Sequence, residues 1–421
     1  MAQHDYVIDN STGANVRADI NNALLAISSN NSGSSAPSTN YASQFFANTT
    51  SSIMQLRNTA NNAHVNLFSL AGGPAFAVDG TINNVAIGKG ANSVASNTCL
   101  GVAALDANVV GGNNTAMGIN ALGSLTDGQQ NTAVGAGCGA TLTTASRCTG
   151  MGYLAIDSAV TGDDNTGIGN QALTDLTSGT NNTCVGSKSG TNFTSGSDNT
   201  AVGFSALLNS VGSNSVAVGS EAMLNNDTGQ SNVAVGYQAL KANVSGSNNV
   251  AIGAISLDVN TTGANNTGCG RASLGSNTTG SNNSAFGLNS LEANTTASHN
   301  TALGYAALMV NTTGTFNTAV GSLALDANTT ADANTAIGYA AATANTTGGN
   351  QSVLGYAALQ VNTTGANNTA IGALAMQQNT TASNNTAVGN EALRYNTTGA
   401  SNVAVGAVSY THLTLPTTPY V

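Results

Sequence analysis

The chain has few side chains of the types that carry out catalysis, and they lie far apart in the sequence. Its four histidines are His4, His64, His299 and His412, and only His299 falls within the repeated part of the chain described below. An imidazole works as a general base when a nucleophile or an orienting carboxylate lies within hydrogen-bond reach. No such partner is evident in the sequence. We therefore interpret His299 as a solvated loop residue.

Two groups of carboxylates have the right chemistry for metal binding or acid–base catalysis. Asp163 and Asp164 begin a turn and offer the oxygen ligands that calcium prefers. A hydrophilic turn is the favoured interpretation, because the calcium-binding nonapeptide pattern GGxGxD is absent. Glu221 and Glu391 occupy equivalent repeat positions but lie ten repeats apart, too far for the paired carboxylates of a glycosidase. The sequence predicts no catalytic, cofactor-binding or metal-binding residue, and we expect the protein not to be an enzyme.

The five cysteines are Cys99, Cys138, Cys148, Cys184 and Cys269, and none belongs to a CxxC pair. Most of them stand where other repeats carry Ala, Val or Thr. We expect small, buried thiols in a protein that folds in a reducing cytoplasm. A metal or disulfide framework remains the alternative.

Asn-x-Thr/Ser sequons recur in the C-terminal half of the chain. In a secretory pathway they would accept glycans, but the N-terminus lacks the basic and apolar regions of a signal peptide. The alternative, which we favour, is a turn asparagine that stacks into a ladder. The sequons begin at Asn277, Asn294, Asn311, Asn328, Asn345, Asn362, Asn379 and Asn396.

Composition excludes several classes of protein. Charged residues make up 6% of the 421 residues, against about 25% in ordinary globular proteins. The net charge is −10 and the eight Lys and Arg are scattered, whereas a nucleic-acid interface needs clustered basic residues. No apolar run reaches the roughly 18 residues of a membrane span. We expect no nucleic-acid partner and no membrane-embedded segment.

The dominant feature is an internal repeat, N-T-A-V-G-x-x-A-L-x-x-N-T-T-G-x-x. Its glycines are 17 residues apart, except that Gly203 and Gly219 are 16 apart. An earlier Gly88 precedes Gly101 by 13, which indicates an atypical first coil of the kind that caps a repeat array. The repeat glycines are Gly101, Gly118, Gly135, Gly152, Gly169, Gly186, Gly203, Gly219, Gly236, Gly253, Gly270, Gly287, Gly304, Gly321, Gly338, Gly355, Gly372, Gly389 and Gly406.

Each repeat contains a short strand that ends at the glycine. The residues one and three positions before the glycine share one face, and a small residue, usually Ala, takes the other. We predict that the apolar residue before the glycine points into the core, so that Val235→Asp would bury a charge, whereas Tyr237 tolerates change. The small residue is expected where another backbone approaches. The Ala-Leu pair that follows the glycine forms a second wall, as a strand or a helical turn, and Asn-Thr-Thr-Gly forms a turn.

This pattern predicts an all-β fold: a parallel β-solenoid or β-roll of about 18 coils with a 17-residue period over residues 76–407. Residues 1–75 are predicted to form a small α+β module, with a helix over Ala14–Ser29 and three short strands. At about 4.8 Å per coil the rod would be about 85 Å long. The apolar burial in one thin coil is too small to offset the ordering of its backbone. We therefore expect a parallel homotrimer, with the small-residue face against the second and third chains.

Two segments resemble known families. Ser213–Gly219 (SNSVAVG) and Asn248–Gly253 (NNVAIG) resemble the head repeats of trimeric autotransporter adhesins, the YadA-like β-roll. The segments MAQHDYVIDNSTGANVRADINNALLAI and YASQFFANTTSSIMQLRNTANNAHVNL resemble the N-terminal part of tail-fibre-like proteins of marine bacteriophages. Adhesin-head coils are shorter, so Asn-Thr-Thr-Gly would be an added loop.

The resemblance implies a structural fibre protein of a phage tail. Its N-terminal module would attach to tail proteins, and its shaft would recognise a bacterial surface glycan or outer-membrane protein. The expected location is the virion tail, after synthesis in the host cytoplasm. The alternative is a bacterial trimeric autotransporter-type adhesin on the cell surface.

Residues 408–421 depart abruptly from the repeat. Written back as codons, VSYTHLTLPT at 408–417 resembles a translated transposon adapter of the kind used in sequencing libraries. We expect this tail to be foreign and the native C-terminus to lie beyond it.

Overall fold

The structure is a computed structural model that describes residues 20, 21, 24, 45–48, 53–57, 64–69, 80–82, 85–108, 110–158 and 161–409. Near the N-terminus, β1 (Phe45–Asn48), β2 (Ile53–Arg57) and β3 (His64–Ser69) form an antiparallel sheet in that order. The three predicted strands are therefore confirmed. Of the predicted helix, Ile20, Asn21 and Leu24 are helical, and its other residues lie outside the described ones, as do residues 410–421 of the predicted foreign tail.

The solenoid begins with a reversal of direction. Strand β4 (Gly80–Ile82) pairs antiparallel with β5 (Val85–Gly88), and β5 pairs antiparallel with β6 (Thr98–Gly101). A short 3-10 turn, η1 (Ala91–Ser93), lies between β5 and β6. From β6 onward every pairing is parallel. The sequence predicted an atypical first coil from the short interval between Gly88 and Gly101, and the structure shows that this opening unit is antiparallel.

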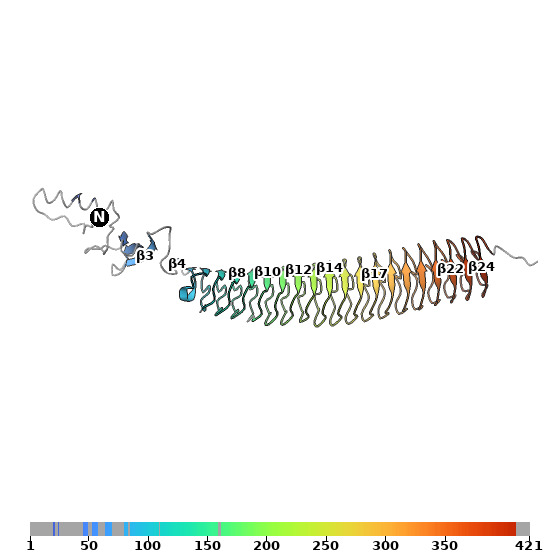
Figure 1. Cartoon of the computed structure of the whole chain (residues 1–421), viewed down its shortest axis with the longest axis horizontal. Helices are drawn as coiled ribbons and strands as arrows, with labels where there is room; N and C mark the ends of the chain where they lie inside the picture. The colour runs from blue at the N-terminus through green and yellow to red at the C-terminus, as the bar shows by residue number, and fades with distance from the viewer. Residues whose placement is uncertain are drawn as a thin grey trace, which may run out of the picture.

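Each later repeat contributes one strand, and each strand pairs in parallel and in register with the equivalent strand of the next coil (Figure 1). This confirms the all-β solenoid of about 18 coils. The strands are β7 (Thr115–Met117), β8 (Thr132–Val134), β9 (Thr149–Met151), β10 (Thr166–Ile168), β11 (Thr183–Val185), β12 (Thr200–Val202), β13 (Val216–Val218), β14 (Val233–Val235), β15 (Val250–Ile252), β16 (Thr267–Cys269), β17 (Ser284–Phe286), β18 (Thr301–Leu303), β19 (Thr318–Val320), β20 (Thr335–Ile337), β21 (Ser352–Leu354), β22 (Thr369–Ile371), β23 (Thr386–Val388) and β24 (Val403–Val405).

The repeat glycine is required at the corner after each strand. Gly236 has φ of 137°, a conformation that side chains disfavour. A Cβ at this position would lie 2.6 Å from the carbonyl carbon and oxygen of Gly253, its equivalent in the next coil. Even alanine would therefore push the coils apart, which explains why the glycine recurs in every repeat.

The predicted orientation of the strand residues is wrong. In β14, Ala234 is completely buried, whereas Val235 is 37% exposed and Val233 is half-buried. The same order recurs along the solenoid: the small residue points into the coil, and its two neighbours point out. The residue before the glycine is therefore not the core residue, and the small-residue face is not available to a second or third chain.

The small residue faces inward because the two walls of the coil lie close together. At Gly167, which replaces this alanine in β10, a Cβ would meet Ile156 Cγ1 of the preceding coil at 2.7 Å and the carbonyl oxygen of Ala172 at 3.1 Å. Ala172 belongs to the opposite wall of the same coil. The expected close approach of a backbone is thus correct, but the backbone comes from the same chain, and there is no room for a larger side chain in most coils.

The opposite wall is neither a strand nor a helical turn. In the coil of β14, Gln238 and Leu240 both adopt left-handed backbone conformations, with φ of 56° and 54°. Their amides donate in opposite directions along the rod, Gln238 to the carbonyl of Ser220 and Leu240 to that of Ser256. Leu240 is completely buried, in the same hydrophobic core cluster as Ala239 and Ala234. Two left-handed residues per wall therefore connect each coil to both neighbours while turning the leucine inward.

A ladder of buried asparagines lies at the corner before the strands. The Nδ2 of Asn249 donates to the carbonyl of Gly263 at 2.9 Å, and its Oδ1 accepts the amide of Asn266 at 2.9 Å. Cys148, Ser215 and Gln351 take the asparagine's place in three coils. The buried asparagines are Asn97, Asn114, Asn131, Asn165, Asn182, Asn199, Asn232, Asn249, Asn266, Asn283, Asn300, Asn317, Asn334, Asn368 and Asn385.

The sequon asparagines form a second ladder, which confirms the stacking interpretation. The Nδ2 of Asn311 donates to Asn294 Oδ1 at 3.1 Å and to the Gly314 carbonyl at 2.9 Å, and its Oδ1 accepts from Asn328 Nδ2 at 2.8 Å. These side chains are completely buried from Asn226 to Asn379, and Asn396 is half-buried. Four earlier coils fill the same corner with apolar side chains, namely Leu125, Leu142, Leu176 and Phe193.

Replacing Ala234 by Asp should unfold the central coils. The carboxylate would be enclosed by Ala239 and Leu240 without a partner, at a cost of about 3–5 kcal/mol. Tyr237→Asp, on a side chain that is 53% exposed, should cost less than about 1 kcal/mol. Thermal melts followed by circular dichroism test this, and similar losses for the two variants would contradict the inward assignment.

Asn311→Ala should be destabilising although it buries no charge. It leaves Asn294 Oδ1 without its donor and Asn328 Nδ2 without one acceptor, at a cost of about 2–4 kcal/mol. The control is Thr313→Ala, two residues away on an exposed side chain. Urea denaturation should separate the variants clearly, and an Asn311→Ala midpoint at the wild-type value would show that the ladder contributes no stability.

Candidate interaction surface

The outward side of the parallel sheet is a continuous face along the whole solenoid. We call it the outer face, and it is made by the residues one and three positions before each repeat glycine. The first set is apolar throughout and is called the apolar row. The apolar row consists of Leu100, Met117, Val134, Met151, Ile168, Val185, Val202, Val218, Val235, Ile252, Cys269, Phe286, Leu303, Val320, Ile337, Leu354, Ile371, Val388 and Val405.

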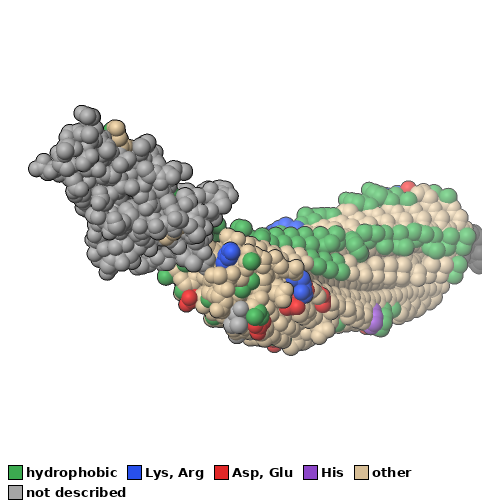
Figure 2. Space-filling model, turned by 60° about the vertical axis from the view of Figure 1, so that its left-hand side comes forward, with side chains coloured by type: hydrophobic (Ala, Val, Ile, Leu, Met, Phe, Trp, Pro, Cys, Tyr) green, Lys and Arg blue, Asp and Glu red, His purple; other side chains and the backbone are tan. Residues whose placement is uncertain are grey.

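The apolar row is strongly exposed for its composition. Ile252 is 41% exposed, Phe286 41% and Leu303 48%, and the row forms a hydrophobic band along the rod in Figure 2. The companion row three positions before the glycine is Thr, Ser or Val in every coil from β6 to β24, so the outer face carries no charged side chain. Removing water from such a face on association therefore costs little free energy.

Exposed aromatic side chains stack between neighbouring coils at two other rows. The rings of Tyr339 and Tyr356, which follow the repeat glycine, lie 5.6 Å apart. The rings of His299 and Phe316, which lie five positions before the glycine, are 5.1 Å apart and inclined by 5°. The prediction of a solvated loop residue at His299 did not include this pair. The signal was present, since the two residues are 17 apart.

Asp163 and Asp164 both form ion pairs with the guanidinium of a neighbouring arginine. Arg147, from the preceding coil, contacts Asp163 Oδ2 at 2.9 Å and Asp164 Oδ1 at 2.7 Å. Asp163 Oδ1 also accepts the backbone amide of Ser146. Hydrogen bonding from the guanidinium lowers the pKa of Asp164 below its ordinary value. The arrangement is a hydrophilic, ion-paired turn. Within the described ranges, no three His, Cys, Asp or Glu side chains come together as a metal-binding group.

Glu221 and Glu391 are not brought together. Ten coils separate them, about 48 Å along the rod. Glu221 accepts from Lys241 Nζ at 2.8 Å and from Gln238 Nε2 at 2.8 Å, and these hydrogen bonds lower its pKa. Glu391 pairs with Arg394 at 3.0 Å. Each of these two carboxylates therefore has a local cation as its partner, and the two do not form the closely spaced pair that glycoside hydrolysis needs.

All five cysteines are thiols. Cys99, Cys138, Cys148 and Cys184 are buried, as predicted, whereas Cys269 lies half-exposed in the apolar row. Burial raises the pKa of Cys138 and of Cys184 to about 12. A thiolate is the reactive form of cysteine, so these side chains serve as small apolar fillers.

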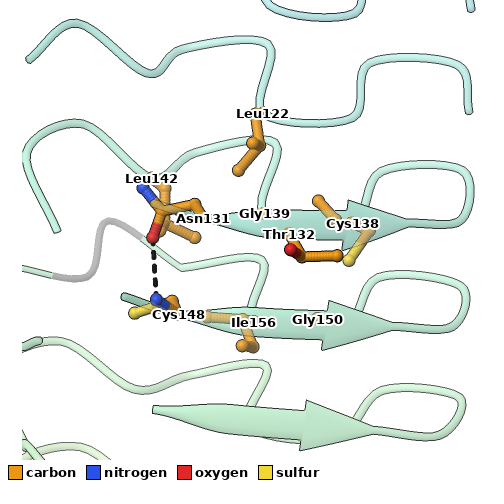
Figure 3. A pocket seen from close by; sticks show the side chains of 10 residues that line it. Leu122, Asn131, Thr132, Cys138, Gly139, Leu142, Cys148, Gly150 and Ile156 are labelled. Atoms are coloured by element: carbon orange, nitrogen blue, oxygen red, sulfur yellow. Dashed lines mark hydrogen bonds between the residues drawn. The ribbon is translucent and has the colours of Figure 1, made fainter. Parts of the chain in front are cut away.

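One apolar cavity of about 10 Å³, lined by Leu122, Cys138, Leu142 and Ile156, lies between coils (Figure 3). This is at the lower limit for a single water. Figure 3 also shows Asn131 Oδ1 accepting the amide of Cys148 at 2.8 Å, so the asparagine ladder continues where cysteine replaces the asparagine.

Two further observations bear on the surface. An open, polar depression of about 340 Å³ near the start of the rod is lined by Asp106, Asn120, Ser124 and Thr141, among others. No helix in the described part of the chain is long and apolar enough to cross a bilayer. His4 and His412, and the side chain of His64, lie outside the described residues.

The comparisons with known proteins give no relative. The chain matches no protein-family model, no curated protein and no solved structure.

The buried thiols should make stability decrease in alkali. Cys138 and Cys184 keep their protons in the folded state, where the pKa is about 12, but release them when unfolded, near 9. The unfolded state therefore binds fewer protons above pH 9, and each thiol should lower the unfolding free energy by about 1.4 kcal/mol per pH unit from there toward pH 12.

A double variant isolates this effect. Cys138→Ala and Cys184→Ala restore the residue that most coils carry at these positions, so the fold should be preserved. Urea midpoints between pH 8 and pH 10.5 should fall less steeply for the double variant than for the wild type. Parallel curves would show that the thiols do not contribute to the alkaline loss.

Proposed function

We propose that the chain is a fibre protein whose shaft is a parallel homotrimer, held together through the outer face. The observation that carries this proposal is the unbroken apolar row, which is exposed or half-exposed in every coil and free of charge. Soluble monomers rarely expose contiguous apolar patches beyond a few hundred Å². The outer face, about 85 Å long and two side-chain rows wide, presents roughly 800 Å² per chain. That is about the area that one partner contributes to a stable interface.

The periodicity of the outer face favours copies of the same chain as its partners. Apolar side chains recur at every coil, about 4.8 Å apart. A second copy has the same spacing between coils, so its apolar side chains would match those of the first copy along the whole rod. A globular partner would cover only a few coils. A parallel arrangement also brings the N-terminal modules to one end, as attachment at that end requires. The interface thus lies on the apolar row, and not on the small-residue face that the sequence suggested.

We infer that this fibre belongs to a phage tail, attaches through residues 1–75 to tail proteins and carries host-surface recognition on its shaft. The resemblance of the N-terminal segment to tail-fibre-like proteins of marine bacteriophages supports this role. The adhesin-like motifs at Ser213–Gly219 and Asn248–Gly253 favour the second candidate, a trimeric surface adhesin of a bacterium. The genes that flank this one distinguish the two: tail and capsid genes favour the virion, and a secreted, membrane-anchored reading frame favours the adhesin.

Charges in the apolar row should dissociate the fibre. The double variant Val235→Asp/Ile252→Asp places carboxylates on two adjacent coils of the outer face, where they would be desolvated on association. Light scattering should give three times the mass of one chain for the wild type. For the variant, all or most of the protein should have the mass of a single chain. Far-ultraviolet circular dichroism should show the β-structure retained.

Thr262→Asp/Thr279→Asp is the matched control, because it adds the same charge on exposed side chains away from the outer face. Its mass should equal that of the wild type. Cys269 provides an independent readout, since a thiol in the apolar row should react slowly with a maleimide in the trimer and quickly in the dissociated variant. A folded wild-type monomer, or rapid labelling of wild-type Cys269, would refute the trimer.

A further inference from the structure

From the coil of β7 to that of β24, one row of the solenoid has a left-handed backbone and is exposed to solvent. This row, called the corner row, is the residue five positions before each repeat glycine. A left-handed conformation favours Asn and Asp over other side chains, and Asn occupies half of the positions. The corner row consists of Asn113, Gln130, Arg147, Asp164, Asn181, Asp198, Asn214, Ser231, Asn248, Asn265, Asn282, His299, Phe316, Ala333, Asn350, Asn367, Asn384 and Ser401.

Phe316 is the most unusual member of the corner row. It has φ of 59°, which is unfavourable for a bulky aromatic residue, and its side chain is 63% exposed. No burial in the solenoid compensates for this. His299 and Ala333, its neighbours along the row, also depart from Asn. A residue that breaks a local rule without a gain in packing indicates a functional position.

The three residues create a stack with a vacant place. The rings of His299 and Phe316 lie one above the other, 5.1 Å apart and nearly parallel. The next rung is Ala333, which ends at Cβ, and the rung after it is Asn350. One face of the Phe316 ring therefore looks over Ala333 toward Asn350, two coils or about 10 Å away. A flat ring above Ala333 would continue the stack at the spacing that His299 and Phe316 already have.

The edge of this slot carries a hydrogen-bond acceptor and a donor. Asp332 Oδ1 accepts from the amide and hydroxyl of Thr315, at 2.6 and 2.9 Å, which fixes the carboxylate and leaves the acceptor capacity of Oδ2. In other coils a side chain from the next coil accepts the amide at this position, as Ser383 Oγ does for Ala366. Gly349 stands there instead, so the Asp332 amide has no such side-chain acceptor.

We propose that this slot binds one uncharged hexopyranose ring of a surface glycan. The C–H face of the sugar would lie on the negative face of the Phe316 ring. A sugar hydroxyl would donate to Asp332 Oδ2, and the Asn350 amide would contact the opposite face. The fixed carboxylate and the net charge of −10 disfavour acidic sugars. The site rests on the proposed role in host-surface recognition and gives that role a ligand class.

The test uses the full chain and substitutions that return the site to the common repeat sequence. Phe316→Asn removes the ring, and Ala333→Asn fills the slot. Both introduce the residue that the corner row prefers, so they should not unfold the protein. Saturation-transfer NMR titrations with methyl β-glucopyranoside, methyl β-galactopyranoside, methyl α-mannopyranoside and N-acetylglucosamine should detect binding of at least one sugar to the wild type. Each variant should bind that sugar about tenfold more weakly or worse.

Ser231→Asn, a corner-row change in a distant coil, is the control and should leave sugar binding at the wild-type level. The corresponding methyl glucuronide should bind more weakly than the neutral sugar. The proposal is overturned if none of the four sugars binds the wild type, or if Phe316→Asn and Ala333→Asn bind as the wild type does. If the protein has the mass of a trimer but binds no sugar, the sugar site is refuted and the trimeric fibre stands. If the protein binds a sugar but is a monomer, the fibre is refuted and the sugar site stands.

Discussion

The structure depends on hydrogen bonds between equivalent residues of successive coils. Thr200, Val216 and Val233 illustrate the rule, since the amide of each donates to a carbonyl of the next coil. The buried asparagines extend the same rule to side chains. A buried amide group is costly without partners, and Asn249 has its partners only while the next coil is in place. Coil stability is therefore a property of neighbours, as in other repeat proteins.

This dependence explains the unusual backbone of the coil. Leu240 and Gln238 hold left-handed conformations, each at a cost of about 1–2 kcal/mol relative to ordinary regions. Such strain persists only where the surroundings over-determine it. Here each of these residues donates its amide to a neighbouring coil, on opposite sides. The backbone of this wall is thus strained at these residues, and only the hydrogen bonds to neighbouring coils stabilise it. A single coil or an isolated peptide would not adopt this conformation.

The period, the corner glycine, the stacked asparagines and the three N-terminal strands could all be predicted, because each follows from residue types at fixed spacing. The direction of the strand residues could not. Alternation places Ala234 and Val235 on opposite faces but does not say which face is inside, and the larger apolar residue is the usual choice for a core. In this coil the opposite wall is too near for it. The separation of the walls depends on the left-handed residues near Leu240, whose conformation has no clear signal in the sequence. The slot beside Phe316 was detectable in principle, since three successive coils lose the asparagine that suits its conformation.

The inward turn of the alanine has a consequence for the surface. Because the interior of most coils accepts one large apolar side chain beside small and amide side chains, the valines and isoleucines that a larger core would enclose are left on the outer face. In the proposed fibre, assembly and recognition would fall on different rows. The apolar row is nearly constant in type, whereas the corner row varies because its side chains point to solvent. A substitution in the corner row changes one exposed side chain and leaves the buried asparagine ladder intact. The ladder in turn fixes the axial spacing between coils, so Phe316 and Asp332 would already hold set positions before the proposed sugar binds. Preorganisation of this kind lowers the entropic cost of binding. A rigid repetitive shaft can thus support weak, specific contacts on its surface, because the backbone that presents them is ordered by the stack and not by the ligand.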